Sequence, residues 1–230
     1  MGCNDRLVSG FNKNTSMVGL MNRNLYVQYG CGWSSPSEWL NFDASPTLYF
    51  ERIPIIGQMY TKNHARFPSN VRYGDIVKGL PIEPDSCSAV YCSHILEHLA
   101  RDDFKTALRN THRILRSGSV FRLVLPDLKY LALRYVNSDT VDAAEVFMRE
   151  SGLGYQQRRK DLKGLLLSWL GNSQHLWMWD WNSIAVELNN SGFSDIRRAY
   201  FGDYEDQKFR SVEDEARWNN CLGVQCKKFA

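Results

Sequence analysis

The sequence has 230 residues, with 28 Lys and Arg against 25 Asp and Glu, so its formal charge at pH 7 is only +3. Hydrophobic residues make up 43% and aromatic residues 13%, which is too rich for a disordered chain. No apolar run approaches the ~18 residues that a membrane span needs. We therefore expect one soluble globular domain, without a strong nucleic-acid signal or a membrane span.

The first 21 residues mix charged and amide residues with single apolar ones, so they contain no secretory apolar region. The six cysteines include no C-x-x-C pair and no zinc-ribbon spacing, which favours reduced thiols. Both features predict a cytoplasmic protein. Oligomeric state leaves no trace in the sequence.

In the first hundred residues, four short apolar runs each end in glycine or polar residues. The predicted strands cover residues 25–29, 39–42, 71–73 and 88–92, and they are followed by Gly30-Cys31-Gly32, Asp43, Gly74-Asp75 and Ser93-His94. In open α/β sheets, ligands bind at the carboxyl ends of the strands. These residues are therefore expected to line one binding edge.

The second half of the chain mixes helical and strand patterns. An amphipathic helix is predicted over 102–116, capped by Asp102 or Asp103 and stopped by Gly118. The remaining elements are a buried strand at 120–125, two or three helices within 128–171, a helix at 181–190, and strands at 195–201 and 221–229 around an acidic loop. We expect an α/β, doubly wound sheet over residues 1–230, with 25–127 as the cofactor-binding half, 128–180 as a helical cover and 181–230 as a C-terminal helix and strand pair.

The glycines after the first strand suggest a ligand. Gly30 and Gly32 carry no side chains that would keep a ligand from the backbone, and Asp43 follows Gly30 by 13 residues. A carboxylate there could accept hydrogen bonds from both hydroxyls of a ribose. Rossmann dehydrogenases place this acid about 20 residues on and use a third glycine, whereas residues 33–37 fill that space here. The first helix must then be very short.

Seven segments together resemble the class I S-adenosylmethionine-dependent methyltransferases, and in particular the small type 11 methyltransferase-like group. They are Tyr29-Gly30-Cys31-Gly32, Trp39 to Asp43, Tyr73 to Ile76, Leu80-Pro81, Ser93 to Leu99, Arg113 to Leu115 and Leu125 to Asp127. They lie in the family's order within residues 25–127. The resemblance implies a seven-stranded sheet of order 3-2-1-4-5-7-6, with the last strand antiparallel.

The resemblance also implies S-adenosyl-L-methionine as the cofactor and S-adenosyl-L-homocysteine as the product. The residues that it places around the methionine, ribose and adenine parts are Tyr29, Gly30, Cys31, Gly32, Asp43, Ala44, Asp75, Ile76, Ser93 and His94. Gln28 departs from the family, since many members carry an acid there that grips the methionine amine. Ser117-Gly118-Ser119 replaces a Pro-Gly-Gly, and the shortened first helix brings Trp33 toward the cofactor.

Three histidines are candidates for the base that removes a proton from the methyl acceptor, because an unperturbed imidazole is neutral near pH 7. His94 follows the fourth strand, His98 lies four residues later and His175 lies in the predicted cover; Asp127 is a candidate for orienting the acceptor. All three histidines could equally be structural. His94 to His98 also fits H-x-x-E-H, which leaves a zinc hydrolase using His94, Glu97 and His98 as a remote alternative; otherwise no metal is expected.

Trp169, Trp177, Trp179 and Trp181 cluster near His175, either as packing within the cover or as an aromatic wall for an acceptor. The predicted function is methyl transfer to an unidentified acceptor, small-molecule or sugar-like. The other reading is a binding module that keeps the fold without catalysis. Asp43 and Asp75 favour the enzyme, since a module without cofactor would not need acids at those strand ends.

Overall fold

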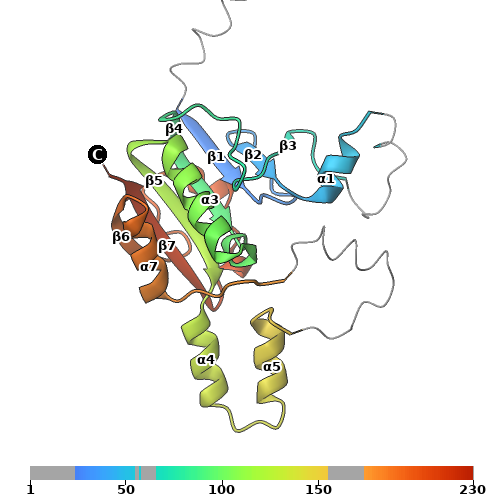
Figure 1. Ribbon diagram of the computed structural model, residues 1–230, viewed down its shortest axis with the longest axis vertical. Helices are drawn as coiled ribbons and strands as arrows, with labels where there is room; N and C mark the ends of the chain where they lie inside the picture. The colour runs from blue at the N-terminus through green and yellow to red at the C-terminus, as the bar shows by residue number, and fades with distance from the viewer. Residues whose placement is uncertain (1–23, 55–56, 58–65, 155–173, 230) are drawn as a thin grey trace, which may run out of the picture.

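The computed structural model describes residues 24–54, 57, 66–154 and 174–229. Their strands form one sheet in the order β3-β2-β1-β4-β5-β7-β6 (Figure 1). The strands are β1 Leu25–Tyr29, β2 Leu40–Asp43, β3 Val71–Tyr73, β4 Cys87–Ser93, β5 Leu115–Pro126, β6 Phe193–Ala199 and β7 Cys221–Lys228. Strands β1 to β5 pair in parallel, whereas β7 pairs antiparallel with both β5 and β6. The predicted fold class and strand order are confirmed.

Two long helices, α3 and α7, cover the same face of the sheet (Figure 1). The helices are α1 Pro46–Glu51, α3 Arg101–Ile114, α4 Leu128–Val136, α5 Ala143–Glu150 and α7 Trp181–Asn190, with short 3-10 helices η1 Leu96–His98, η2 Gln207–Ser211 and η3 Glu215–Arg217. Helices α4 and α5 project from the body as a pair. Of the residues described, none forms a helix that is both long and apolar enough to cross a membrane.

The core lies between the central strands and the helices α3 and α7. Phe104 and Leu108 of α3 are fully buried, and Phe104 stacks on Trp179 at 4.1 Å between ring centroids. Aromatic stacking of this kind adds to the gain from burying apolar area. Trp179 is therefore a core residue, which settles one member of the tryptophan cluster as packing.

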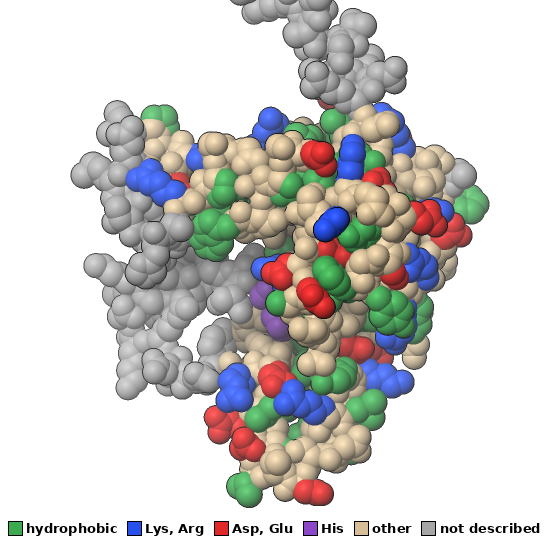
Figure 2. Space-filling model, turned by 180° about the vertical axis from the view of Figure 1, so that it is seen from behind, with side chains coloured by type: hydrophobic (Ala, Val, Ile, Leu, Met, Phe, Trp, Pro, Cys, Tyr) green, Lys and Arg blue, Asp and Glu red, His purple; other side chains and the backbone are tan. Residues whose placement is uncertain are grey.

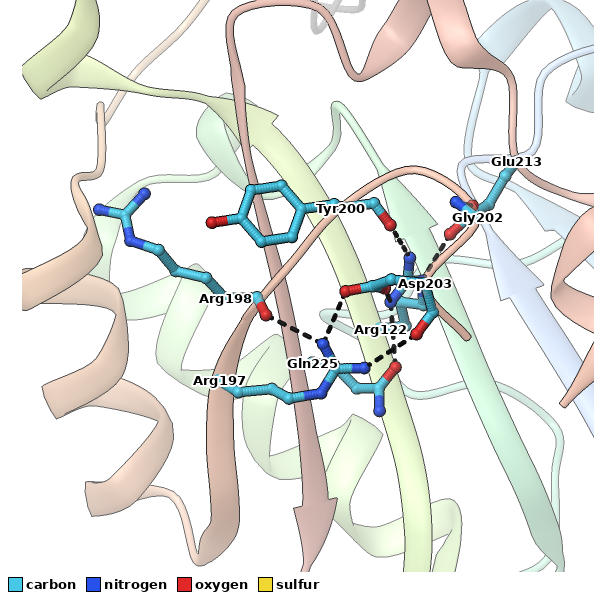
Figure 3. A network of polar contacts seen from close by, with 8 residues as sticks. All are labelled: Arg122, Arg197, Arg198, Tyr200, Gly202, Asp203, Glu213 and Gln225. Carbon is cyan, nitrogen blue, oxygen red and sulfur yellow. Dashed lines mark hydrogen bonds and ion pairs between the residues drawn. The ribbon is translucent and has the colours of Figure 1, made fainter. Parts of the chain in front are cut away.

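The opposite face of the sheet is covered by the loop between β6 and β7. Arg122 of β5 points to this face with no exposed surface, and it donates to Glu213, Asp203, Gln225 and the carbonyl of Tyr200 (Figure 3). A buried charge is tolerated only when it is paired and hydrogen-bonded. This network therefore fixes the loop to the sheet.

Several predicted boundaries are wrong. Residues 30–39 form turns without any helix, so the first helix is missing rather than very short. Helix α3 begins after Ala100, which makes no side-chain cap, and it ends at Ile114 because Leu115 already pairs with Cys87 in the sheet. Gly118 consequently lies inside β5, at φ 74°, and does not stop the helix.

The predicted cover is described in part. Helices α4 and α5 account for residues 128–136 and 143–150, separated by turns, so this stretch is not helical throughout. The pair is held by the rings of Tyr135 and Phe147 at 5.5 Å and by an ion pair between Arg134 and Glu150. Residues 155–173, with Trp169, lie outside the described residues, and the role of the segment as a cover stays a prediction.

Candidate functional site

The loop after β1 contains two glycines, Gly30 and Gly32, and their surroundings differ. Both adopt left-handed backbone, at φ 66° for Gly30 and φ 55° for Gly32, a region that disfavours side chains. A Cβ on Gly30 would lie 2.0 Å from Cδ1 of Ile95, so Gly30 is required by packing. A Cβ on Gly32 would meet nothing within 4 Å. The open space beside the backbone therefore lies at Gly32.

Asp43, at the end of β2, ties this loop to the neighbouring strand. Its Oδ2 accepts from the backbone amide of Gly32 at 2.9 Å, and its Oδ1 accepts from the amide of Ser45 at 2.8 Å. The residue is only 9% exposed. A carboxylate has about four lone-pair directions, so acceptor capacity for two more donors is left. This geometry fits the ribose role that the resemblance implies.

Asp75 lies at the corresponding place after β3. Its Oδ1 accepts from the amide of Val77 at 2.9 Å, and its Oδ2 is 3.6 Å from Nζ of Lys78. The side chain of Ile76 is buried in the core, whereas Ala44 is exposed beside Asp43. Asp75 is thus held by its own turn, at the same edge of the sheet as Asp43.

Two of the predicted cofactor residues can offer only their backbone. The ring of Tyr29 is buried, and its hydroxyl accepts from Thr111 at 3.3 Å. The side chain of Cys31 belongs to a buried cluster with Leu48, and burial raises the pKa of its thiol to about 12. A contact of either residue with the cofactor stays a prediction.

Gln28 and Trp33 hold the loop between β1 and β2 in place although it contains no helix. Nε2 of Gln28, which is buried, donates to Oδ1 of Asn41 at 2.6 Å and to the carbonyl of Ser34 at 3.0 Å. The ring of Trp33 stacks on Phe67 at 4.8 Å and remains 54% exposed. The glutamine that replaces the expected acid is thus a brace for the loop.

His94 has the strongest backbone constraint at this edge. It adopts φ 56°, which is rare for a side chain of this size, while its amide donates to the carbonyl of Val124 at 2.8 Å. Nδ1 lies 2.9 Å from Oγ of Ser93, and Nε2 lies 3.5 Å from Sγ of Cys221. Such backbone strain persists where the surroundings enforce it and is common at active sites.

The electrostatics around His94 favour its neutral form. Burial lowers the pKa of the imidazole to about 4, with further lowering from the positive charge of Arg217 and from the other two histidines. Arg217 itself donates to the carbonyl of Ser93 at 3.2 Å. His94 therefore has an unprotonated nitrogen throughout the physiological pH range.

The other two histidines lie together with Glu97, apart from His94. The rings of His98 and His175 are 4.9 Å apart, and Nε2 of His175 lies 3.9 Å from Oε1 of Glu97. Burial raises the pKa of the Glu97 carboxyl to about 8. In the space-filling view, histidine side chains gather in a recess above the part that holds α4 and α5 (Figure 2).

This grouping corrects the H-x-x-E-H interpretation. The chain leaves β4 at Ser93 and forms only the short η1, so residues 94–98 are not a turn of α-helix. Within the described ranges, the group whose ligand atoms approach one another closely contains Glu97, His98 and His175. His94 is not part of it, so the arrangement expected of a zinc hydrolase with His94 does not form.

Asp127 caps a helix. Its Oδ1 accepts from the amides of Lys129 and Tyr130 at 2.9 and 3.3 Å, which is the bonding pattern of an N-cap of α4. Trp177 is 42% exposed, with the guanidinium of Arg101 5.3 Å from its ring. The cap gives Asp127 a structural function, and its role in orienting an acceptor stays a prediction.

Sequence reasoning missed two residues of this site. Arg217 lies in a loop that was identified only as acidic, and Cys221 was noted only as a free thiol at the start of a strand. Their approach to Ser93 and His94 depends on the return of β7 beside β5. Only the antiparallel pairing of the last strand could have suggested it.

Part of the chain matches a known protein family. Residues 27–123 match a family model described as a methyltransferase domain, which covers β1 to most of β5. No curated protein matches the sequence significantly.

Among solved structures, a SAM-dependent methyltransferase from Archaeoglobus fulgidus is 12% identical with a TM-score of 0.48, and the match covers 91% of this chain and 88% of that one. PigF, solved with SAH, is 16% identical at TM-score 0.45, with coverages of 90% and 56%. Phosphoethanolamine N-methyltransferase 2 from Haemonchus contortus, solved with S-adenosyl-L-methionine, is 11% identical at TM-score 0.45, with coverages of 96% and 53%.

The chain spans just over half the length of the last two proteins. These identities and scores are too low to indicate a shared acceptor. The family match includes β2, the glycine loop after β1 and Asp43 at the end of β2. Residues 27–123 therefore match a methyltransferase domain, and they lie in a sheet with the strand order β3-β2-β1-β4-β5-β7-β6.

Proposed function

We propose that the protein transfers a methyl group from S-adenosylmethionine to a small-molecule or sugar-like acceptor. The observation that carries the cofactor assignment is the hydrogen bond from the amide of Gly32 to Asp43. It joins the open glycine loop to an acid at the next strand end. An edge built this way can hold a nucleoside whose ribose lies on β2.

The residues of this edge have distinct roles in the proposal. Gly32 lets the backbone approach the methionine part, Gly30 forms the turn that leads to it, and Asp43 accepts from the ribose hydroxyls. Asp75 with the backbone at Ile76 binds the adenine, beside Ala44, and Ser93 borders the methionine part. When bound, S-adenosylmethionine supplies an activated methyl group on a positively charged sulfur.

The protein's own contribution to the reaction is mainly position. Holding two reactants in line can lower a barrier by roughly 7 to 11 kcal/mol. An oxygen or nitrogen acceptor must also lose a proton, for which a positioned base adds about 10² to 10⁴ in rate. His94 is the first candidate for this base, with His98 and His175 as alternatives, because burial keeps the His94 imidazole neutral and its strained backbone fixes its position.

Calorimetry with S-adenosylmethionine and S-adenosylhomocysteine tests the cofactor site without knowledge of the acceptor. Asp43→Ala should weaken binding by about 1.5 to 3 kcal/mol, the usual cost of losing hydrogen bonds to a charged group. Asp195→Asn is the control, because that exposed acid on β6 approaches Lys227 at 3.7 Å and asparagine tolerates its left-handed backbone at φ 50°. Thermal unfolding of both variants separates lost binding from lost folding.

Two results would contradict the proposal. Equal affinity of wild type and Asp43→Ala would remove the ribose role, and no binding of either compound to wild type would favour a module without catalysis. If binding is found, a panel of hydroxylated and amino acceptors, sugars included, can be assayed for S-adenosylhomocysteine release. Activity confined to macromolecular acceptors would contradict the small-molecule part.

A further inference from the structure

Glu97, His98 and His175 bring three metal-ligating side chains together from two distant parts of the chain. Glu97 and His98 lie in η1, directly after β4, and His175 lies in the segment before α7. One ligand atom from each lies within 4.8 Å of the other two. The backbone fixes this meeting, because the carbonyl of Glu97 accepts from the amides of Leu176 and Trp177 at 2.7 and 3.1 Å.

Both histidines are oriented by hydrogen bonds on the same ring nitrogen. Nδ1 of His98 lies 2.9 Å from the carbonyl oxygen of Gln174, and Nδ1 of His175 lies 2.7 Å from that of Ser151. A carbonyl oxygen can only accept, so Nδ1 carries the proton in each ring. In the neutral ring with this tautomer, Nε2 offers a lone pair. Metal-binding histidines characteristically have this second hydrogen bond, which fixes tautomer and orientation.

Glu97 is the buried acid of this group. Its side chain has no exposed surface, and among the residues that the structure describes neither carboxylate oxygen has a hydrogen-bond partner. Nε2 of His175 lies 3.9 Å from Oε1 of Glu97, beyond hydrogen-bond distance. A buried carboxylate without partners is costly, and coordination to a cation is one of the ways in which proteins satisfy it.

Gly152 indicates that the place of His175 is built into the fold. Gly152 has φ 67°, and a Cβ there would lie 2.5 Å from Nδ1 of His175. A side chain at this position would push the ring away from its carbonyl partner on Ser151. The backbone therefore makes room for the imidazole at the position from which it faces Glu97.

We propose that Glu97, His98 and His175 bind a divalent transition-metal ion, with Zn²⁺ as the best match to two imidazoles and one carboxylate. Three protein ligands leave a position open, which is the pattern of catalytic rather than structural zinc sites. Ligand atoms around tetrahedral zinc are about 3.4 Å apart at bonds of ~2.0 to 2.1 Å. The present spacing of up to 4.8 Å would have to shorten by up to about 1.4 Å, which side-chain rotation can supply.

The test is zinc binding by the full chain after treatment with a chelator. Calorimetry with ZnCl₂ should give one equivalent for wild type, and Co²⁺ should give visible absorption bands of a site with fewer than six ligands. Glu97→Gln and His175→Ala should each weaken Zn²⁺ binding by at least 100-fold. His112→Gln is the matched control, because that histidine packs on Phe193 and lies outside the group.

The variants also need a measure of folding. Glu97→Gln keeps the shape of the side chain and removes only its charge, so its circular dichroism should match wild type while Zn²⁺ no longer raises its melting temperature. No binding to wild type would overturn the proposal. So would wild-type affinity in Glu97→Gln and His175→Ala, which would assign the ion to other residues such as the cysteines. Neither result depends on binding of S-adenosylmethionine.

Discussion

Replacing Arg122 by methionine should destabilise the protein strongly, because the arginine is the hub of a buried network. Its side chain has no exposed surface, and Nε lies 2.5 Å from Oε1 of Glu213, a carboxylate that is also fully buried (Figure 3). Nη1 lies 2.7 Å from Oδ1 of Asp203, and the guanidinium lies 4.7 Å from the ring of Trp218. Methionine would fill most of the volume and leave two carboxylates without their cation.

Removing one partner of a buried pair typically costs about 3 to 5 kcal/mol, mainly through the charge that stays behind. For Glu213 the remaining recorded contact is the amide of Gly202 at 3.1 Å, which does not replace an ion pair. We therefore expect Arg122→Met to lose about 3 to 5 kcal/mol of unfolding free energy. Arg197→Met should lose no more than about 1 kcal/mol, because Arg197 contacts the same Asp203 but is 42% exposed.

Urea unfolding, followed by circular dichroism and tryptophan fluorescence, measures both variants under the same conditions. The double variant Arg122→Met with Glu213→Leu should recover part of the loss, since it removes the orphaned charge together with its partner. The reasoning would be refuted if Arg122→Met unfolded within 0.5 kcal/mol of wild type. Purely additive losses in the double variant would equally refute it.

Three further predictions follow from single residues. Burial lowers the pKa of His94 to about 4, so only the unfolded chain takes up a proton at this residue as pH falls from 6.5 to 4. The folded protein should therefore lose about 2 to 3 kcal/mol of stability over that range, and His94→Asn should lose less, as measured by urea unfolding at each pH. Burial raises the pKa of the Cys31 thiol to about 12, so iodoacetamide at pH 8 should label it roughly 10³ times more slowly in the native than in the urea-unfolded protein. Equal labelling rates by mass spectrometry would contradict this. Gly30→Ala should be more destabilising than Gly32→Ala, because a Cβ at residue 30 clashes with Ile95 whereas a Cβ at residue 32 meets open space. Gly32→Ala should cost only the ~1 to 2 kcal/mol of a left-handed backbone, and equal melting temperatures of the two variants would count against the prediction.

The strands were predictable because each is an apolar run that ends abruptly. The break after Tyr29 and the acid after Phe42 are local features, and the structure places them as expected at one edge. The missing helix was harder to foresee. The loop needs no helix because Gln28 reaches across to Asn41 and Ser34, and a glutamine in a strand gives no sign of that in the sequence.

Contacts between residues far apart in the sequence could not be predicted from it. Arg122 stands in an apolar strand, and its partner Glu213 is 91 positions away, so neither residue type nor spacing indicates the pair. His98 and His175 were both candidates, but their meeting with Glu97 requires the backbone hydrogen bonds that bring the segment after residue 173 to η1. A charged residue in a buried strand signals that a partner exists without saying where.

The loop that Arg122 holds also reaches the edge of the sheet where Ser93 and His94 lie. Four residues after Glu213, Arg217 donates to the carbonyl of Ser93, and its positive charge helps to lower the pKa of His94. Arg122→Lys keeps the charge but loses the planar fork that serves several acceptors at once, so the loop should loosen while the protein stays folded.

We therefore expect the pKa of His94 in Arg122→Lys to rise from about 4 toward the ordinary value of 6.5, as water enters and Arg217 withdraws. NMR titration of the imidazole signals measures this directly, with His112 as the internal reference and Arg197→Met as the control for the surface of the same loop. An unchanged pKa of His94 in an Arg122→Lys protein that urea shows to be destabilised would mean that the network holds the loop without shaping the site. A rise would show that a buried pair on one face of the sheet sets the protonation of a histidine at its edge, because the loop between them transmits the constraint.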